Sequence, residues 1–405
     1  MSKFIRVGDF KLGREEKKAV NEVLDSGRLS EGDKVWEFER KWADYIGTKY
    51  SVAVSSGSGA LICLFAGLKN IYGISNGSQI ITSPLTYIAD TNALVVNNLE
   101  PVFVDIDKDK FLITGEAIEE KIRKSKNKKK IRAVLAVDLM GYAVDIEKIK
   151  KVCDKYNLLL IEDAAQAHGS IYESGGRCGS KALGAIYSFY IAHNIQAGEM
   201  GSVVSNNLEI IKSVKKIKAQ GRSCDCLTCT RSEGVCPGIG RLKNEKGDYD
   251  PRFTHDLIGY NFKTMEFQAA LALTQLAKVK KIIKKRQENV MYLNKRFDKY
   301  SQLLQLPIYD EKVSYLAYPI VIKDNRKISR KRLRGELEKN EVETRPLFGC
   351  IPTQQPAYEF MKKEYKGKLP VADYVGGNGF YIGCHQYLRK QDLDYVVNVF
   401  EKILG

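Results

Sequence analysis

The sequence lacks any long uninterrupted apolar stretch, although apolar residues make up 44% of its 405 positions. A membrane-spanning helix needs about 18 to 20 consecutive apolar residues, and no segment approaches that length. The opening MSKFIRVGDF also lacks the apolar core and the small-residue cleavage site of a secretion signal. We therefore expect a soluble protein of the cytoplasm with no membrane partner.

Acidic residues are fewer than basic ones, 49 against 65, which gives a formal net charge of +16. Such an excess attracts nucleic acids, anionic membranes or small anionic molecules. The lysine-rich runs at 121–132 and 278–287 contain no interleaved aromatic residues and no recognisable reading helix. We interpret both runs as solvated helix faces, with attraction of small anions as the alternative, and we expect no nucleic-acid partner.

Internal repeats and long disordered linkers are also missing, and short apolar runs alternate with helical segments instead. The runs at 50–56, 131–139 and 157–164 predict buried strands, whereas 59–70 and 146–156 have helical periodicity. This alternation is typical of an α/β fold, in which helices cover both faces of a mostly parallel sheet.

Two structural units are expected from the length and from the change of pattern along the chain. Residues 1–263 form the predicted large α/β domain, in which 222–252 is an inserted loop rich in cysteine and glycine. Residues 264–405 begin with one long predicted helix and continue as a smaller α+β domain.

Two segments could hold a planar anionic ligand. The turn at 55–61 follows a strand and opens a helix, so its backbone amides would face an anion at the positive helix end. A purely structural turn is the alternative. Tyr87 comes just after a predicted strand, where an aromatic ring can stack on a planar ligand, although a core or surface aromatic explains it equally well.

Two acids, Glu162 and Asp163, lie at the carboxyl end of an apolar strand. Binding sites in open α/β sheets lie at that end of the strands. A buried carboxylate needs a partner, and a protonated pyridine nitrogen suits Asp163. The alternative is an acid that caps the next helix.

Taken together, eight motifs in this order resemble the DegT/StrS family of nucleotide-sugar aminotransferases and dehydratases, over essentially the whole chain. The resemblance implies the fold type I of pyridoxal-phosphate-dependent transferases. It also implies a homodimer whose active sites draw on both subunits. The motifs are SGRLSEGDKVWEFERKWADYIG, VSSGSGAL, SPLTYIAD, PVFVDID, IEDAAQAHG, YSFYIAHNIQAGEMGSVVSN, GYNFKTMEFQAALALTQL and FYIGCHQYL.

The same resemblance implies a phosphate site for pyridoxal 5′-phosphate or pyridoxamine 5′-phosphate. Backbone groups of Gly57 and Ser58, with the hydroxyl of Ser188, would bind the phosphate. Asn261 would reach the phosphate of the cofactor held by the neighbouring subunit. Hydroxyl, amide and backbone donors all suit phosphate oxygens.

For the cofactor ring, the resemblance implies three further residues. Tyr87 would cover the ring and Asp163 would pair with its nitrogen. Gln166 would lie near the 3-hydroxyl group. Asp163 and Tyr87 are the two of these that the strand pattern also indicates.

His193 is the decisive departure from the family's aminotransferases, which have a lysine bonded to the cofactor at this position. Imidazole cannot form that bond, but it can act as an acid or base near neutral pH. The change resembles the dehydratase branch, which binds the cofactor as pyridoxamine phosphate. It implies removal of the C3 hydroxyl from a nucleotide-diphosphate 4-keto-6-deoxysugar, for dideoxysugar biosynthesis. Arg345, in a dehydratase-like segment at 342–358, would contact the sugar or its diphosphate.

Four of the nine cysteines crowd into the predicted loop: Cys224, Cys226, Cys229 and Cys236. The cytoplasm keeps thiols reduced, and four thiolates suit a [2Fe-2S] cluster or a zinc ion equally well. A similar insertion in one dehydratase holds a [2Fe-2S] cluster served by a flavin reductase, which implies a reductase partner here. One ligand position of that relative is Ala164 or Ala165 in this chain, so Cys178 is a substitute candidate and unligated thiols remain an alternative.

Two other functions stay open. The chain could be an aminotransferase that uses Lys181 or Lys263, although neither occupies the position of His193. It could also be a regulator that binds vitamin B6 or a sugar nucleotide without catalysis. Retention of Asp163 and of the phosphate motif argues against the regulator.

Overall fold

The computed structural model describes residues 4–230, 250 and 253–405, and its centre is a seven-stranded sheet. The strand order is β1-β7-β6-β5-β4-β2-β3. The pairs from β6 to β3 are parallel, and β7 is antiparallel to both β6 and β1. The predicted mostly parallel sheet is confirmed, with strands β1 (Tyr50–Val54), β2 (Gln79–Thr82), β3 (Glu100–Phe103), β4 (Ile131–Val137), β5 (Leu159–Asp163), β6 (Gly184–Ser188) and β7 (Gly201–Ser205).

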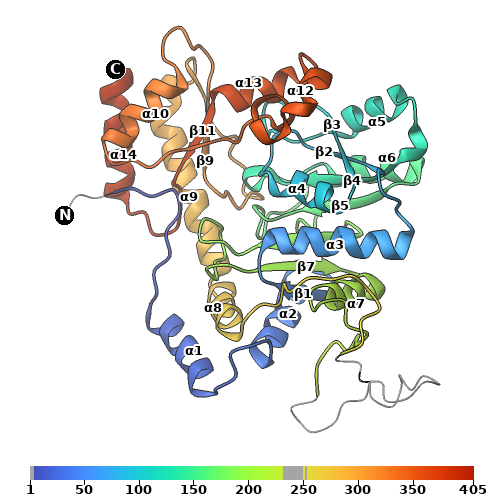
Figure 1. Ribbon diagram of the computed structural model, residues 1–405. Coiled ribbons are helices and arrows are strands. Elements are labelled where there is room, and N and C mark those ends of the chain that lie inside the picture. Colours follow the sequence, from blue (N-terminus) through green and yellow to red (C-terminus); the bar gives the residue numbers. More distant parts are fainter. Residues whose placement is uncertain (1–3, 231–249, 251–252) are drawn as a thin grey trace.

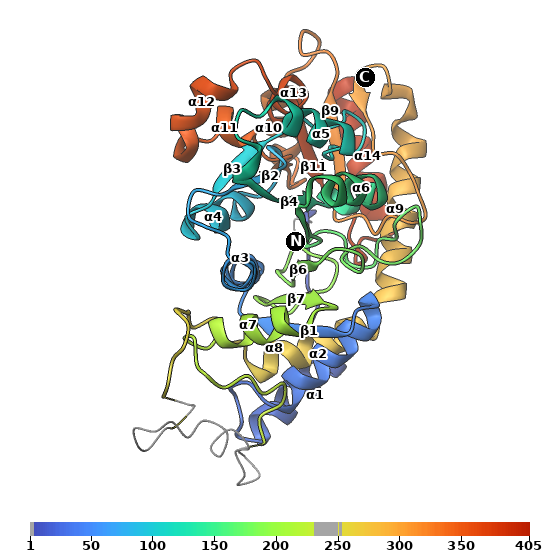
Figure 2. The same ribbon diagram turned by 90° about the vertical axis from the view of Figure 1, so that its right-hand side faces the viewer.

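Helices cover both faces of this sheet and build two apolar cores (Figure 2). One face packs against helices α3 (Gly57–Tyr72), α4 (Ala89–Val96) and α7 (Leu208–Ile217). The other face packs against α2 (Asp33–Ile46), α5 (Gly115–Lys124) and α6 (Ile146–Tyr156). The two-sided covering explains why the strand sequences are continuously apolar rather than alternating.

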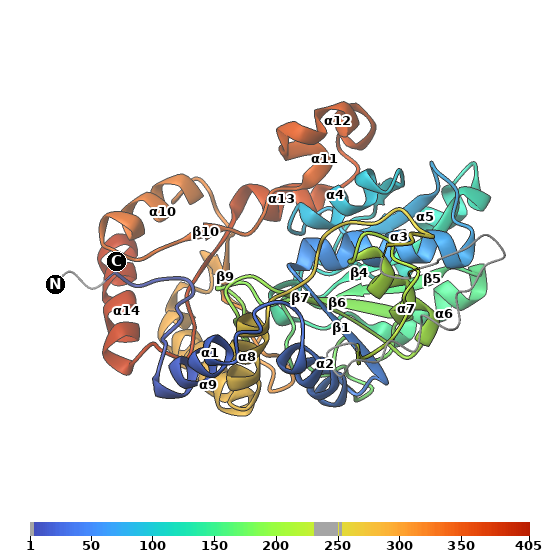
Figure 3. The same ribbon diagram turned by 60° about the horizontal axis from the view of Figure 1, so that its bottom comes forward.

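A smaller antiparallel sheet, in the order β10-β11-β9-β8, lies in the C-terminal part of the chain. Figure 3 shows its helices α10 and α14 at one side of the molecule, away from the central sheet. No helix among the described residues has the length and apolar character needed to cross a membrane. The elements are β8 (Leu304–Gln305), β9 (Tyr318–Ile322), α10 (Arg330–Lys339), β10 (Arg345–Pro346), α11 (Ile351–Gln354), α12 (Glu359–Tyr365), α13 (Pro370–Asn378), β11 (Gly379–Ile382) and α14 (Lys390–Leu404).

The first described residues also lie against this C-terminal part. Ile5 forms a parallel bridge with Val342, and the Val7 amide donates to a Glu343 carboxylate oxygen at 2.8 Å. The chain then passes to α1 (Arg14–Asp25), at the opposite end of the molecule (Figure 1). The proposed domain boundary near residue 263 stays a prediction.

The long helix predicted after residue 264 is two helices, α8 (Glu266–Leu276) and α9 (Val279–Phe297). The two helices are separated by Ala277 and Lys278, and Lys278 has φ of −104° and ψ of 0°. Its ammonium group lies 2.7 Å from a Glu15 oxygen and 2.5 Å from a Glu16 oxygen, both in α1. The break therefore coincides with an ionic contact to the N-terminal helix, which apolar spacing cannot reveal.

Helix α2 is capped by a side chain from the far part of the sequence. The buried Glu266 carboxylate accepts backbone N–H groups of Gly32, Lys34 and Val35 at 2.7, 2.8 and 2.9 Å. The first turn of a helix has unsatisfied amides and a partial positive charge, so a carboxylate is well matched to it. This contact fixes α2 against α8.

We expect Glu266→Ala to lower the free energy of unfolding by about 3 kcal/mol, because several charge-assisted hydrogen bonds to buried amides are lost together. Urea unfolding followed by circular dichroism measures the loss. Glu22→Ala is the control, since Glu22 is exposed and its nearest ammonium contacts are 3.8 and 3.9 Å away. That change should cost less than about 0.5 kcal/mol. Equal losses in the two variants would contradict the capping role.

Candidate functional site

The candidate site lies where β5 and β6 end beside the start of α3. Asp163 is the last residue of β5, Ser188 is the last of β6, and Gly57 opens α3. A Cβ atom at Gly57 would lie 2.7 Å from the Ser188 Cβ, so only glycine allows this approach. The parallel strands thus bring their carboxyl ends to one place, as binding sites in open sheets require.

The start of α3 offers free donors to an anion. The Ser56 side chain caps the helix by accepting the Gly59 amide at 3.1 Å. The amides of Gly57 and Ser58 and the Ser188 hydroxyl make no hydrogen bond to other described residues. In a 16-residue helix these amides lie at the positive end of the dipole. The predicted phosphate residues therefore come together.

Asp163 is buried at the bottom of this site and is paired with a second acid. Its Oδ1 atom accepts the Ala165 amide at 2.8 Å, and a side-chain hydrogen bond joins it to Asp90 in the first turn of α4. Burial raises the pKa of Asp163 above its ordinary value. The Thr86 hydroxyl donates to Asp90 Oδ2 at 2.6 Å. Sequence analysis missed Asp90, because it read as an ordinary helix residue.

The two ring-contacting candidates differ in their surroundings. Gln166 accepts the Met140 amide through Oε1 at 2.9 Å, so its amide nitrogen remains a donor. Tyr87 is 60% exposed and faces Phe348 edge-on at a ring distance of 6.0 Å. Tyr87 is therefore not a core residue but a rim residue that an added planar ligand could contact.

His193 lies in the loop that joins β6 to β7. The Phe189 amide bonds to the Met200 carbonyl at 2.8 Å, which closes the base of this loop. The His193 amide bonds to the Tyr190 carbonyl at 2.8 Å, and its own carbonyl accepts the Gln196 amide side chain at 3.0 Å. The imidazole ring lies 5.8 Å from that of His168. The position of His193 is thus set by its backbone.

The surroundings of His193 favour its neutral form. Burial, and then the nearby Arg286 charge, lower the pKa of the imidazole to about 3. Its Nδ1 atom is buried and has no hydrogen-bond partner among the described residues. At neutral pH the ring is therefore a free base.

Arg286 corrects the interpretation of the basic run 278–287 as a wholly solvated face. Its side chain is fully buried and donates to the carbonyls of Tyr315 and Leu316 at 3.2 and 2.7 Å. Ile282, four residues earlier, is also buried, so the run has one inward stripe. The many lysines of the run make this buried stripe hard to recognise from the sequence.

Arg345 and Asn261 occupy the rim. Arg345, in β10, pairs with Glu343 at 3.0 Å and also hydrogen-bonds to Tyr381. Asn261 is exposed and forms a backbone bridge with Ala219. The next residue after Asn261 accepts the Ser55 amide at 2.8 Å, just before the start of α3. Whether Asn261 reaches a neighbouring subunit stays a prediction.

The cysteine-rich loop is only partly described. Cys224 and Cys226 are half-buried, Cys229 is exposed, and Cys236 lies outside the described residues. In the described part of the chain, these thiols do not form a ligand group with all atoms within 4.8 Å. Lys212 pairs with Asp225 at 3.2 Å and ties the loop to α7. The metal assignment of this loop stays a prediction.

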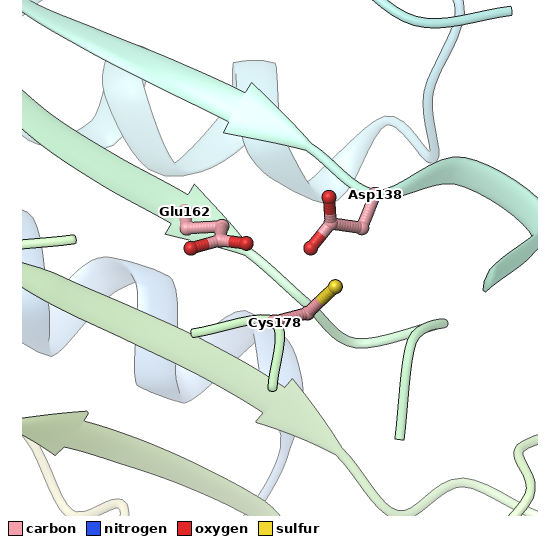
Figure 4. Close-up of side chains that lie close together, drawn as sticks. All are labelled: Asp138, Glu162 and Cys178. Carbon is pink, nitrogen blue, oxygen red and sulfur yellow. The ribbon is translucent and has the colours of Figure 1, made fainter. Parts of the chain in front are cut away.

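Cys178 lies instead in a buried cluster with Asp138 and Glu162 (Figure 4). Their ligand atoms lie within 4.8 Å of one another, and the Tyr172 hydroxyl donates to Glu162 at 2.6 Å. Burial, and then the neighbouring Glu162, raise the pKa of Asp138 well above its ordinary value. The two carboxyl groups therefore share a proton at neutral pH.

Residues 11–401 match the DegT/DnrJ/EryC1/StrS aminotransferase family. The lipopolysaccharide biosynthesis protein RfbH of Salmonella typhimurium is 31% identical over 97% of this chain and 90% of its own length. GDP-perosamine synthase of Vibrio cholerae is 31% identical over 90% of this chain and 89% of its own. A histidine-to-asparagine variant of GDP-4-keto-6-deoxymannose-3-dehydratase, with bound GDP-perosamine, superposes with a TM-score of 0.85. That structure is 25% identical and covers 98% of this chain and 99% of its own.

The shared proton of Asp138 and Glu162 makes folding depend on pH. A carboxyl whose pKa is raised by folding contributes stability at low pH and loses it as the pH rises above about 4. Asp138→Asn keeps a donor to Glu162 but cannot ionise, so it should gain stability relative to the wild type as the pH rises. Urea midpoints between about pH 5 and pH 8 measure the difference. Parallel profiles for the two proteins would refute the shared proton.

Proposed function

Because the chain belongs to the DegT/DnrJ/EryC1/StrS aminotransferase family, we propose that it is a pyridoxamine-phosphate-dependent 3-dehydratase. Its substrate is a nucleotide-diphosphate 4-keto-6-deoxyhexose, which loses its C3 hydroxyl. The observation that carries the proposal is His193, a neutral base with a buried Nδ1 atom, in the loop where the family's aminotransferases have their lysine. The similarity to a solved 3-dehydratase that was studied as a histidine-to-asparagine variant supports the same role.

The residues present fit the cofactor. Two free amides and a hydroxyl at the start of α3 suit its phosphate, and the Gln166 amide nitrogen can donate to its 3-oxygen. Asp163, buried and without a basic partner among the described residues, suits a protonated ring nitrogen. When bound, pyridoxamine phosphate supplies an amine for the sugar ketone and an electron-withdrawing ring.

His193 moves the proton in this proposal. Its pKa of about 3 leaves an imidazole nitrogen unprotonated, so it can accept a proton at neutral pH. The imidazolium formed is acidic for the same reason, and it can return that proton to the departing C3 hydroxyl. The burial that lowers the pKa makes the imidazolium a stronger acid and the imidazole a weaker base, so it favours the return of the proton to the departing hydroxyl.

Rim residues position the substrate. Arg345 directs a guanidinium fork, already oriented by Glu343, toward the sugar or its diphosphate. Tyr87, exposed beside Phe348, covers the ring of the cofactor. Asn261 donates to the phosphate in a neighbouring subunit, which makes the active form a homodimer.

Loss of the imidazole base should abolish dehydration. We expect His193→Asn to lower turnover by about a hundredfold to ten-thousandfold, the usual contribution of a positioned acid or base. Binding of pyridoxamine phosphate should change by less than about threefold, because none of the proposed cofactor contacts is removed. Release of water from the nucleotide sugar is followed by mass spectrometry, and cofactor binding by absorption.

His255→Asn is the matched control for that experiment, since His255 is an exposed histidine just after the insertion at 222–252. It should keep wild-type turnover. Unchanged turnover in His193→Asn would remove His193 from the mechanism.

The cysteine-rich loop adds a second component to the proposal, a [2Fe-2S] cluster that receives electrons from a reductase, with zinc as the alternative. The three described thiols do not by themselves complete such a site, and the dehydration proposed above does not depend on it. The cluster bears on whether the cofactor amine is preserved by electron delivery or renewed from glutamate.

The metal content of anaerobically purified protein tests this component. We expect visible iron-sulfur absorption and about two iron and two sulfide per chain. Cys224→Ser should lose this absorption, whereas Cys178→Ser should keep it, because Cys178 lies with Asp138 and Glu162 rather than in the loop. Colourless protein, or zinc in place of iron, would refute the cluster.

An aminotransferase remains the second candidate, since GDP-perosamine synthase is a similar relative. It would need another lysine at the site. The Lys181 ammonium is bound to Glu147 at 2.7 Å and to Ser174 at 2.8 Å. Lys263 is exposed beside Asn261. Neither contact set favours the aminotransferase.

A further inference from the structure

We propose that Asp90 is a positioning residue. Its carboxyl group is protonated and donates a hydrogen bond to the carboxylate of Asp163. The bond keeps Asp163 ionised and oriented toward the ring nitrogen of bound pyridoxamine phosphate. This role rests on the proposed cofactor. It adds to that function a residue of the SPLTYIAD motif to which the sequence analysis gave no role.

The geometry places Asp90 where it can do only this. Its side chain is fully buried in the first turn of α4. Thr86 donates to Oδ2 at 2.6 Å, which uses one oxygen. The other oxygen, Oδ1, is buried and receives no donor from the described residues, while a side-chain hydrogen bond joins the group to Asp163. A hydrogen bond between two carboxyl groups requires a proton on one of them.

The proton belongs on Asp90 rather than on Asp163. Asp163 has a backbone donor, the Ala165 amide, which stabilises its negative charge. Burial, and then the charge of Asp163, raise the pKa of Asp90 well above its ordinary value. No described lysine, arginine or histidine forms an ion pair with either group. Glu162, the neighbour of Asp163 in β5, points to the opposite face of the sheet.

The hydrogen bond from Asp90 changes both the orientation and the basicity of Asp163 toward the ring nitrogen of the cofactor. It holds one carboxylate oxygen in place, so the group keeps its direction when the cofactor enters. It also reduces the basicity of Asp163, so the shared proton stays on the ring nitrogen instead of returning to the carboxylate. The electron-withdrawing form of the ring is thereby favoured.

Binding of pyridoxamine phosphate to three variants tests the proposal. Asp90→Asn keeps a neutral donor and should bind the cofactor within about twofold of the wild type. Asp90→Ala loses the donor and should bind about tenfold more weakly, as expected for one hydrogen bond to a charged group. Asp138→Asn alters the other buried carboxyl pair and is the control, with unchanged affinity.

A spectroscopic signature separates this role from a merely structural one. In Asp90→Ala, the absorption of bound pyridoxamine phosphate should titrate at a lower pH than in the wild type, because the ring nitrogen loses its proton more easily. In Asp90→Asn it should titrate as in the wild type. Infrared spectra of the cofactor-free proteins should lose a carboxylic acid band in Asp90→Asn.

The outcomes are distinguishable. Wild-type protein that fails to bind pyridoxamine phosphate overturns the proposed function, and the role of Asp90 toward the ring falls with it. Wild-type binding together with unchanged affinity and titration in Asp90→Ala overturns the role of Asp90 alone. Asp90→Asn that binds as weakly as Asp90→Ala shows that the charge matters rather than the donated proton, and also overturns it. Carboxylic acid absorption in Asp90→Asn that is undiminished from the wild type has the same consequence, because the Asp138–Glu162 pair accounts for only part of it.

Discussion

Two consecutive buried acids at the end of β5 constrain everything around them. Glu162 and Asp163 point to opposite faces of the sheet, because side chains alternate along a strand. Neither finds a basic partner in the described part of the chain, and each is accompanied by another carboxyl, Asp138 on one side and Asp90 on the other. A buried carboxylate without a cation is costly, so each pair holds one shared proton.

The two pairs differ in what they face. Asp138 and Glu162 are enclosed with Tyr172 and Cys178, and they accept hydrogen bonds from the Val144 amide and the Tyr172 hydroxyl. Asp163 instead lies beside the open start of α3, where donors are left unused. On the Glu162 side, strand β5 therefore contacts an enclosed cluster. On the Asp163 side, it borders the candidate site. The candidate site is the side on which the hydrogen bonds of the protein are incomplete.

The sequence predicted the elements that depend on local patterns. Strand β5 and its terminal acids follow from an apolar run, and the turn at Gly57 follows from a strand, a glycine and a helix in succession. Asp90 and Arg286 could not be found in this way, because their importance comes from Asp163 and His193, which are distant in sequence. His193 itself was identified, but its neutral state was not, since burial and the Arg286 charge appear only in three dimensions. The break of the predicted long helix at Lys278 has the same origin, an ionic contact with α1.

The cap on α2 has a consequence for the order in which the chain folds. The amides of Gly32, Lys34 and Val35 have their hydrogen-bond acceptor in Glu266. Glu16 in α1 has its ion-pair partner in Lys278. During synthesis, the N-terminal helices emerge long before these partners exist, and loop closure over such a distance is slow. Helices α1 and α2 are therefore synthesised before the residues that fix their final place. Until Glu266 is in place, the first turn of α2 lacks its cap, and the apolar face of α2, including Phe38 and Trp42, is not fixed against α8.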